Sequence, residues 1–367
     1  MAERPRGLGH GPVAERAGAA TGAVGTVRRV PSTTRAARPL VSFCVVGTDG
    51  AAFLPACLDA IARERRLLDV PSEVLVLDNA STDDSVRIAR EHPVGARVIA
   101  LDRREGKAAN DSRLLDEAAG RYALLLNEDS ELRAGATKEL LVTLERDDHA
   151  ACAGAMLLRP DGAPQPSAWR FPGLATTLAQ ATLLHRRLVV QSRGQRTRRV
   201  DWCQSACLLV RVEASSSVGH LDPEYFVYGD EVDLQRRLAD AGWHTLYVPS
   251  ARCVHHEGLS TGPGSRRRVV ELHRNQERYL VAHHGRPTAL LCRPLAAWPY
   301  LLRALAATVL PGHDPRRHAW HARAALCPQR GEGIREAAEA FNARLDAGDA
   351  GGRSVGAAGG GGAGTGR

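Results

Sequence analysis

The stretch Tyr122–Leu132, YALLLNEDSEL, joins a short apolar run to an acidic cluster. The run at 123–126 predicts a central strand covered on both faces, because a half-exposed strand would alternate apolar and polar side chains. Polar residues 127–131 follow it directly, and open α/β sheets bind their ligands at the carboxyl ends of strands. Carboxylates at such an edge can hold a divalent cation that neutralises a phosphate. A solvated loop that caps the next helix is the alternative interpretation.

The overall charge favours anionic partners. The 367 residues carry a net charge of +8, almost all of it from arginine, since lysine occurs only at 107 and 138. Such a balance suits nucleotides or anionic lipid head groups. Aromatic residues make up only 4% of the chain, and they do not interleave with a basic patch. We therefore expect no nucleic acid partner of the base-stacking kind.

The cysteines and the N-terminus predict a cytoplasmic protein. Most of the eight cysteines lie in apolar runs such as SFCVV and SACLLV, where a free thiol behaves as a small hydrophobe. Residues 1–38 are rich in Arg, Gly and Ala and lack the apolar core of a secretory signal, so we expect a disordered basic arm.

The most apolar segment is residues 288–311. Arg293, Pro294, Pro299 and Arg303 interrupt it, so it is too short to span a membrane. Two interpretations remain: a peripheral contact with the inner face of a membrane, or a packed helical hairpin.

The order of elements predicts an α/β fold. Strands expected at 39–46, 73–77, 97–101 and 122–126 alternate with helical patterns, which indicates a mostly parallel sheet. No GxGxxG follows the first strand, which weakens a dinucleotide-binding interpretation. Later patterns predict a helix at 137–144, strands at 152–158, 200–211 and 244–248, and a helix at 231–241. Residues 266–345 are expected to be helical and 346–367 to form a disordered Gly-rich tail.

Four clusters of acidic or metal-capable residues end strands or open helices, at 78–84, 127–131, 230–233 and 255–256. Because strand carboxyl ends share one edge of a parallel sheet, we expect these clusters to converge.

Together the motifs resemble those of family 2 glycosyltransferases, in particular the rhamnosyltransferase-like members. The matching stretches, in the family's order, are PLVSFCVV, EVLVLDNASTDDS, EGKAAN, YALLLNEDSEL, VDWCQSACLLVR, EYFVYGDEVDLQRRLADAGW and LYVPSARCVHHEGLST. The resemblance implies a GT-A fold at 39–265, with a nucleotide-sugar half at 39–135 and an acceptor half at 136–265. It also implies a nucleotide-sugar donor, a divalent metal and an inverting displacement.

The resemblance assigns donor-binding roles. Asp78 matches the residue that hydrogen-bonds the nucleobase, with a turn or helix cap as the alternative. Asn127 would bind ribose hydroxyls, and Asp129 would hold Mg²⁺ or Mn²⁺. His255, rather than His256, would be a further metal ligand. Lys107 would contact a phosphate, with an exposed surface role as the alternative.

The acceptor side is implied in the same way. Trp202, Gln204 and Ser205 resemble the acceptor-binding loop, with core packing as an equal alternative for Trp202. Glu231 would take the proton from the acceptor hydroxyl. Here the acids read Asp230-Glu231, the reverse of the family's order, so either could be the base. Acids that favour a helix N-terminus are the alternative.

The implied activity is therefore metal-dependent, inverting transfer of a sugar from a dTDP- or UDP-sugar to a glycan or a lipid-linked acceptor. Residues 47–50 depart from the family's Thr-Tyr-Asn, and the Tyr that walls the nucleobase is absent. That departure leaves a catalytically inactive nucleotide- or glycan-binding module as a rival. A sugar-nucleotide pyrophosphorylase would need a basic first loop, and residues 47–56 contain no Arg or Lys.

Overall fold

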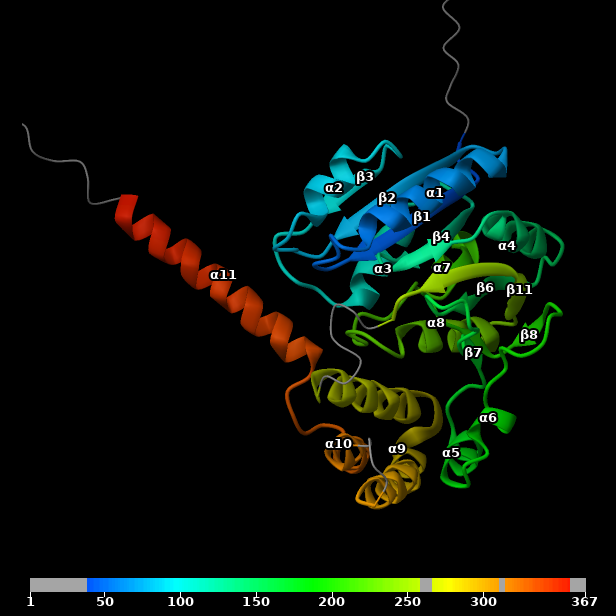
Figure 1. Cartoon of the computed structure of the whole chain (residues 1–367), viewed down its shortest axis with the longest axis vertical. Coiled ribbons are helices and arrows are strands. Elements are labelled where there is room, and N and C mark those ends of the chain that lie inside the picture. The colour runs from blue at the N-terminus through cyan, green and yellow to red at the C-terminus, as the bar shows by residue number, and fades with distance from the viewer. Residues whose placement is uncertain (1–37, 258–265, 310–313, 357–367) are drawn as a thin grey trace, which may run out of the picture. The chain divides into compact units, whose positions relative to one another are not determined.

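A nine-stranded mixed sheet organises the molecule. The computed structural model describes residues 38–257, 266–309 and 314–356, with side chains up to residue 347. The strand order is β3-β2-β1-β4-β10-β6-β11-β5, and β8 pairs with β11 (Figure 1). The bounds are β1 Val41–Gly47, β2 Ser72–Asp78, β3 Arg97–Ala100, β4 Tyr122–Asn127, β5 Ser130–Leu132, β6 Ala150–Leu158, β8 Arg198–Val200, β10 Cys207–Arg211 and β11 His244–His255. A separate two-stranded pair joins β7 Ala168–Trp169 to β9 Trp202–Cys203.

Helices cover both faces of the sheet. The helices of the described residues are α1 Leu54–Leu68, α2 Ser85–Glu91, α3 Lys107–Glu117, α4 Ala136–Glu145, α5 Leu174–Ala181, α6 His185–Leu188, α7 Val212–Ser217, α8 Asp230–Asp240, α9 Arg266–Ala307, α10 Pro315–Leu326 and α11 Ile334–Gly356. The helices that pack on the sheet include α1, α3, α4 and α8. Alternation along β1 separates two cores. Val41, Phe43 and Val45 pack with α1 and α4, whereas Cys44 and Val46 pack with α3 and α8. Successive side chains of a strand point to opposite faces, so a fully apolar strand must be covered on both.

The predicted α/β fold is confirmed. β1, β2, β3 and β4 pair in parallel, as do β6 and β11, while β10 runs antiparallel between β4 and β6. All eight cysteines are free and seven are buried, in agreement with the expectation from their apolar neighbours.

Two predicted strands have different bounds. The strand expected to end at Val248 continues as β11 to His255, across a register shift between Val248 and Arg252 that accommodates Pro249. The single strand expected at 200–211 is interrupted, because β9 ends at Cys203 and β10 begins at Cys207. Both differences matter for the site, since they place His255 on a strand and residues 204–206 in a turn.

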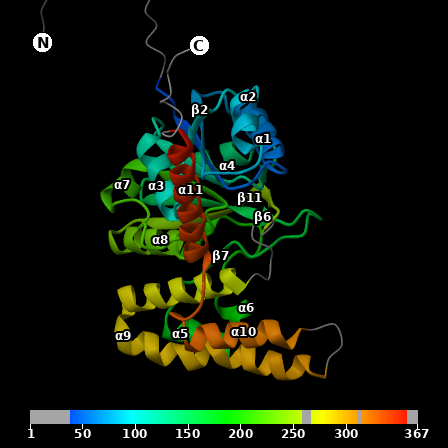
Figure 2. The same cartoon turned by 90° about the vertical axis from the view of Figure 1, so that its left-hand side faces the viewer.

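The C-terminal region is helical, as expected. α9 kinks at Gly285, whose φ is 81°, and its second half packs beside α10 (Figures 1 and 2). α11 runs to Gly356 and so extends beyond residue 345, where the helical region was expected to end. Within the described residues no helix has the length and apolarity needed to cross a membrane. The predicted basic arm, apart from Arg38, and residues 357–367 lie outside the described residues.

A pair of histidines, one buried and one partly buried, joins α9 to α10. Nε2 of His273 lies 3.3 Å from Nδ1 of His321, and the His321 ring stacks on Tyr300 at 4.6 Å. Burial lowers the pKa of His273 to about 3 and that of His321 to about 4. Both rings are therefore neutral in the folded protein at neutral pH, because the charged form is poorly solvated there.

We predict that this pair makes the protein acid-sensitive. The unfolded chain binds these protons near pH 6.5 and the folded chain only near pH 4 and below, so the free energy of unfolding should fall as pH drops from 6.5 to 4. His321→Phe keeps the stacking ring and removes one titrating group. Denaturant unfolding at pH 7 and pH 5 should show that the free energy of unfolding falls less for this variant than for wild type. The exposed His149→Asn serves as the control, and an equal loss in all three proteins would contradict the prediction.

Candidate active site

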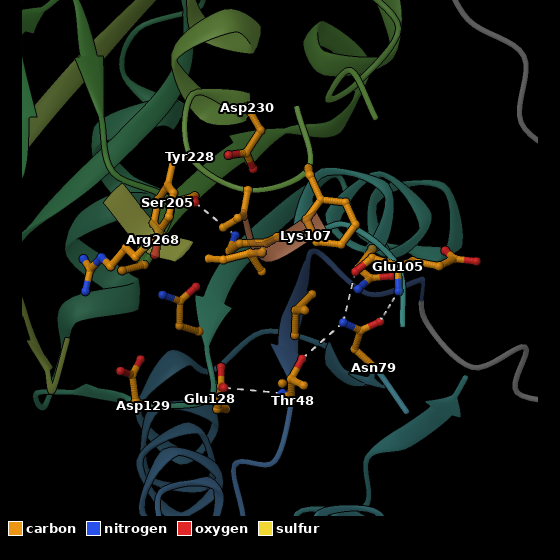
Figure 3. Close-up of a pocket in the computed structure, with 18 of the residues that line it drawn as sticks. Thr48, Asn79, Glu105, Lys107, Glu128, Asp129, Ser205, Tyr228, Asp230 and Arg268 are labelled. Carbon is orange, nitrogen blue, oxygen red and sulfur yellow. Dashed lines mark hydrogen bonds between the residues drawn. The ribbon is translucent and has the colours of Figure 1, made fainter. Parts of the chain in front are cut away.

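A cavity of about 470 Å³ lies at the carboxyl ends of the central strands (Figure 3). Most of the residues predicted from the sequence line it: Lys107, Asn127, Asp129, Gln204, Ser205, Asp230, Glu231 and His255. They come from α3, the β4–β5 connection, the β9–β10 turn, α8 and the end of β11. Asn79 also lines the cavity, so each of the four polar clusters expected to converge on this edge contributes at least one residue to it.

Strand pairing brings Asp129 and His255 together. β11 pairs with β5 so that His255 lies opposite Ser130, and Nε2 of His255 is 3.5 Å from Oδ1 of Asp129. The Gln165 amide contacts Nδ1 of the same ring at 3.0 Å, which fixes the orientation of the imidazole. Burial lowers the pKa of His255, and the Asp129 carboxylate opposes that shift. A neutral imidazole is the form that can ligate a metal.

The same corner holds buried oxygen atoms without hydrogen-bond partners. Oδ1 of Asn127 and Oδ1 of Asp129 are both of this kind. Buried polar atoms are normally satisfied, so such atoms facing a cavity indicate that a ligand completes the site. Among the described residues no group of three or more His, Cys, Asp or Glu side chains is placed to hold a metal. One carboxylate and one imidazole nonetheless fit a hard cation whose other ligands come from a diphosphate.

Lys107 is held inside the cavity rather than at the surface. Its ammonium group forms an ion pair with Asp111, whose side chain is buried, and donates to Oγ of Ser205 at 3.1 Å. Burial lowers the pKa of Lys107, but the neighbouring carboxylates, led by Asp111, outweigh that effect and raise it overall. Lys107 is therefore a fixed positive charge beside the acids of α8 (Figure 3).

The two acids of α8 differ in environment. α8 begins after Gly229, whose φ is 92°, and this sharp start points Asp230 into the cavity (Figure 3). Asp230 is only 1% exposed, and its Oδ2 lacks a hydrogen-bond partner. Burial and then Glu231 raise the pKa of Asp230 well above its usual range, although Lys107 opposes them. Glu231 is more exposed and also lines the cavity.

Two predicted residues lie outside the lining of this cavity. Asp78 is buried, and its carboxylate accepts a hydrogen bond from the backbone of Ser81, which is the turn-capping alternative. Trp202 stacks on Trp169 at 4.6 Å and donates from Nε1 to the carbonyl of Arg170. Both contacts match the structural alternatives for these residues, and their ligand-binding roles remain predictions.

Glu128 explains part of the unusual first loop. A Cβ added at Gly50 would lie 2.6 Å from Cγ of Glu128, and one at Gly47 would lie 3.2 Å from its Cβ. The Glu128 side chain thus occupies space that larger residues at 47 and 50 would fill. Burial, and then Asp129, raise the pKa of Glu128 to about 7. The contact depends on two distant segments, so the sequence carried no direct signal for it.

Gly106, within EGKAAN, is required by close packing. A Cβ at Gly106 would lie 2.8 Å from the backbone oxygen of Phe226. The 223–229 segment, which supplies Phe226 and Tyr228 to the cavity, therefore rests directly on the start of α3. Arg104 and Glu105, just before it, also line the cavity, and sequence reasoning did not single them out.

Comparison with known proteins agrees with this geometry. The family model described as glycosyltransferase like family 2 matches residues 38–276, more than half of the chain. An N-acetylglucosaminyl-diphospho-decaprenol L-rhamnosyltransferase of Mycobacterium tuberculosis is 31% identical over 247 residues, which cover 62% of this chain and 77% of that relative.

Solved structures share the fold. A similar one is GalNAc-T7 with UDP, GalNAc and Mn²⁺, with a TM-score of 0.51, 15% identity, and coverage of 78% of this chain and 55% of that chain. Another is the mannosyltransferase PcManGT from Pyrobaculum calidifontis with GDP-Man and Mn²⁺, with a TM-score of 0.50, 18% identity, and coverage of 79% and 86%. At these identities the likeness shows the fold alone. With the family match and the acidic cavity, it means that this chain belongs to glycosyltransferase family 2 and is a sugar-transferring enzyme.

Proposed function

We propose that the enzyme catalyses metal-dependent, inverting sugar transfer from a nucleotide-diphosphate sugar. The observation that carries the proposal is that Asp129 with His255 and Asp230 with Glu231 line one cavity. One pair suits a cation with its diphosphate, and the other suits a proton transfer. An inverting displacement needs both functions on opposite sides of one anomeric carbon.

Asp129 and His255 would hold Mg²⁺ or Mn²⁺. Oδ1 of Asp129, which has no hydrogen-bond partner, and the oriented imidazole of His255 would supply an oxygen and a nitrogen ligand. When bound, the ion would offset the charge of the diphosphate leaving group. Asn127 would bind a donor hydroxyl nearby, as the resemblance implies. Lys107 would act as a second fixed positive charge for the phosphates.

Glu231 is proposed as the base that takes the proton from the acceptor hydroxyl. Burial, and then Glu231, raise the pKa of Asp230 well above its usual range, which favours its protonated form and makes it the less available proton acceptor of the two. The acceptor oxygen would then form a bond to the anomeric carbon while the bond to the diphosphate breaks. The reversed order of the two acids therefore still leaves a base at the cavity, which favours an active enzyme over an inactive binding module.

The proposed substrates follow from the relatives. The name of the mycobacterial relative specifies an L-rhamnosyltransferase that acts on a lipid-linked N-acetylglucosaminyl diphosphate. We propose a dTDP- or UDP-sugar as donor, with rhamnose as the first candidate, and a glycan or lipid-linked acceptor. Gln204 and Ser205, in the β9–β10 turn, would face the acceptor.

A peripheral membrane contact of a cytoplasmic enzyme fits such an acceptor. The second half of α9 exposes apolar side chains at helical spacing, and the neighbouring α5–α6 segment exposes more. The residues are Leu291, Trp298, Leu301 and Leu305 on α9, and Leu183, Leu184 and Leu188 beside it. Burial, and then the charge of Arg303, lower the pKa of His185, so positive charge adjoins this surface. Apolar side chains ringed by arginines are typical of an interfacial membrane contact.

Glu231→Gln should lower the rate of sugar transfer at least about 100-fold, because the amide cannot accept a proton. Donor affinity, measured by calorimetry, should change little. Asp230→Asn should retain much more activity, since the amide resembles the protonated acid. Asp240→Asn, at the far end of α8, is the matched control. A greater loss in Asp230→Asn than in Glu231→Gln would assign the base to Asp230.

Asp129→Ala should abolish the metal-dependent part of nucleotide binding. The measurement is the rise in melting temperature caused by dTDP or UDP with and without Mn²⁺, since a bound ligand stabilises the folded state. Glu131→Ala removes a nearby acid that pairs with His256 and serves as the control. An unchanged Mn²⁺ effect in Asp129→Ala, together with full sugar transfer, would refute the metal assignment.

The double variant Leu301→Glu/Leu305→Glu should co-sediment several-fold less with vesicles rich in phosphatidylglycerol, because two charges would enter the lipid interface. Leu67→Glu, at an equally exposed leucine of α1, is the control and should bind as wild type does. Equal binding by all three proteins would exclude this surface as the membrane contact.

A further inference from the structure

The helix α11 forms one wall of the cavity although it lies outside the matched family region. Ile334, Ala337 and Ala338 of α11 line the cavity together with Asp49, Asn79 and Arg104. The family match ends at residue 276, well before α11 begins. Figure 1 shows α11 projecting away from the sheet, and hydrogen bonds of Asn342 connect it to the β3–α3 loop. One wall of the cavity therefore comes from a helix beyond the matched region.

Two asparagines clamp the β3–α3 loop from opposite sides. On one side, Asn79 accepts from the backbone N–H of Glu105 at 2.8 Å and donates to its carbonyl at 3.1 Å (Figure 3). On the other side, Asn342 of α11 accepts from the N–H of Arg104 at 2.8 Å and donates to its carbonyl at 3.0 Å. Each amide satisfies both backbone groups of one residue, so the loop cannot shift without breaking paired bonds.

The clamp fixes the guanidinium of Arg104. Its central carbon lies 3.9 Å from the centre of the Phe341 ring, and its Nη2 pairs with Asp49. Its Nε is buried without a hydrogen-bond partner. A planar cation held flat on an aromatic ring is a rigid platform, and such cations also stack on bases. Asp49 belongs to the same loop that lacks the family's aromatic wall.

We propose that Arg104, supported by Phe341 and Asn342, covers the nucleoside of the donor and helps to select its base. The inference rests on the proposed function, because the diphosphate must lie at Asp129 and His255. The acids of α8 then lie at the end of the cavity that would bind the sugar and the acceptor. The remaining end, bounded by Asp49, Asn79 and Arg104, receives the nucleoside. α11 thus supplies from the C-terminus the support that the first loop lacks.

The test compares nucleoside diphosphates with pyrophosphate. Calorimetry in Mn²⁺ would measure the affinity of full-length wild type, Phe341→Ala and Asn342→Ala for dTDP, UDP, GDP and inorganic pyrophosphate. Leu345→Ala, an exposed position on the same helix, is the control. We expect each of the two variants to lose about tenfold in affinity for the preferred nucleoside diphosphate. Affinity for pyrophosphate should be unchanged. The differences in affinity among dTDP, UDP and GDP should become smaller.

Kinetics and rescue add a second readout. Phe341→Ala should raise the KM for the donor with little change in kcat, and Phe341→Tyr should restore the KM, since it keeps an aromatic face. Wild-type affinities in both variants would overturn the inference, as would an equal loss for pyrophosphate and nucleotide. If the wild type binds pyrophosphate but no nucleoside diphosphate, the proposed function itself fails, which is a different outcome.

Discussion

The pairing of β11 with β5 is the constraint on which the site depends. His255 and Asp129 are far apart in the chain, and only the register that sets His255 opposite Ser130 places their side chains 3.5 Å apart. A slip of one residue would turn the imidazole to the other face of the sheet. The register shift between Val248 and Arg252 is part of the same arrangement. β11 pairs with β6 on both sides of this shift, while its other edge pairs with β8 before the shift and with β5 after it. An irregularity in the sheet thus sets the position of a functional side chain.

The cavity concentrates buried charge that the fold must compensate. Asp111 and Asp230 are almost fully buried, and Lys107 lies between them as a shared counter-ion. Buried ion pairs are weak contributors to stability, because desolvation offsets most of the attraction. The presence of these buried charges at the cavity is better explained by the difference in proton affinity that they create between neighbouring acids. Two adjacent acids in unlike environments can take different roles in one reaction.

The central strands and the acidic ends were predictable from the sequence because they depend on local patterns. Continuous apolar runs that stop at polar clusters indicated β1, β2 and β4, and parallel pairing then brought Asn127 and Asp129 to the edge where these strands end. Roles that depend on tertiary packing were harder to foresee. The indole of Trp202 could face a sugar or a core with equal reason, and only the fold stacks it on Trp169.

The contribution of α11 was beyond sequence reasoning for a related reason. Residues 334–347 read as an ordinary amphipathic helix, and nothing local marks Phe341 or Asn342 as partners of a loop more than two hundred residues away. The sequence did show that the first loop lacks its usual aromatic residue. The packing of Glu128 against Gly47 and Gly50 shows why a bulky side chain is unsuited to those positions. Since residues 47–50 of the first loop carry no aromatic side chain, a nucleobase that stacks in this cavity requires a flat partner from another part of the chain. Arg104 on Phe341 is a planar surface that meets this requirement at the edge of the cavity.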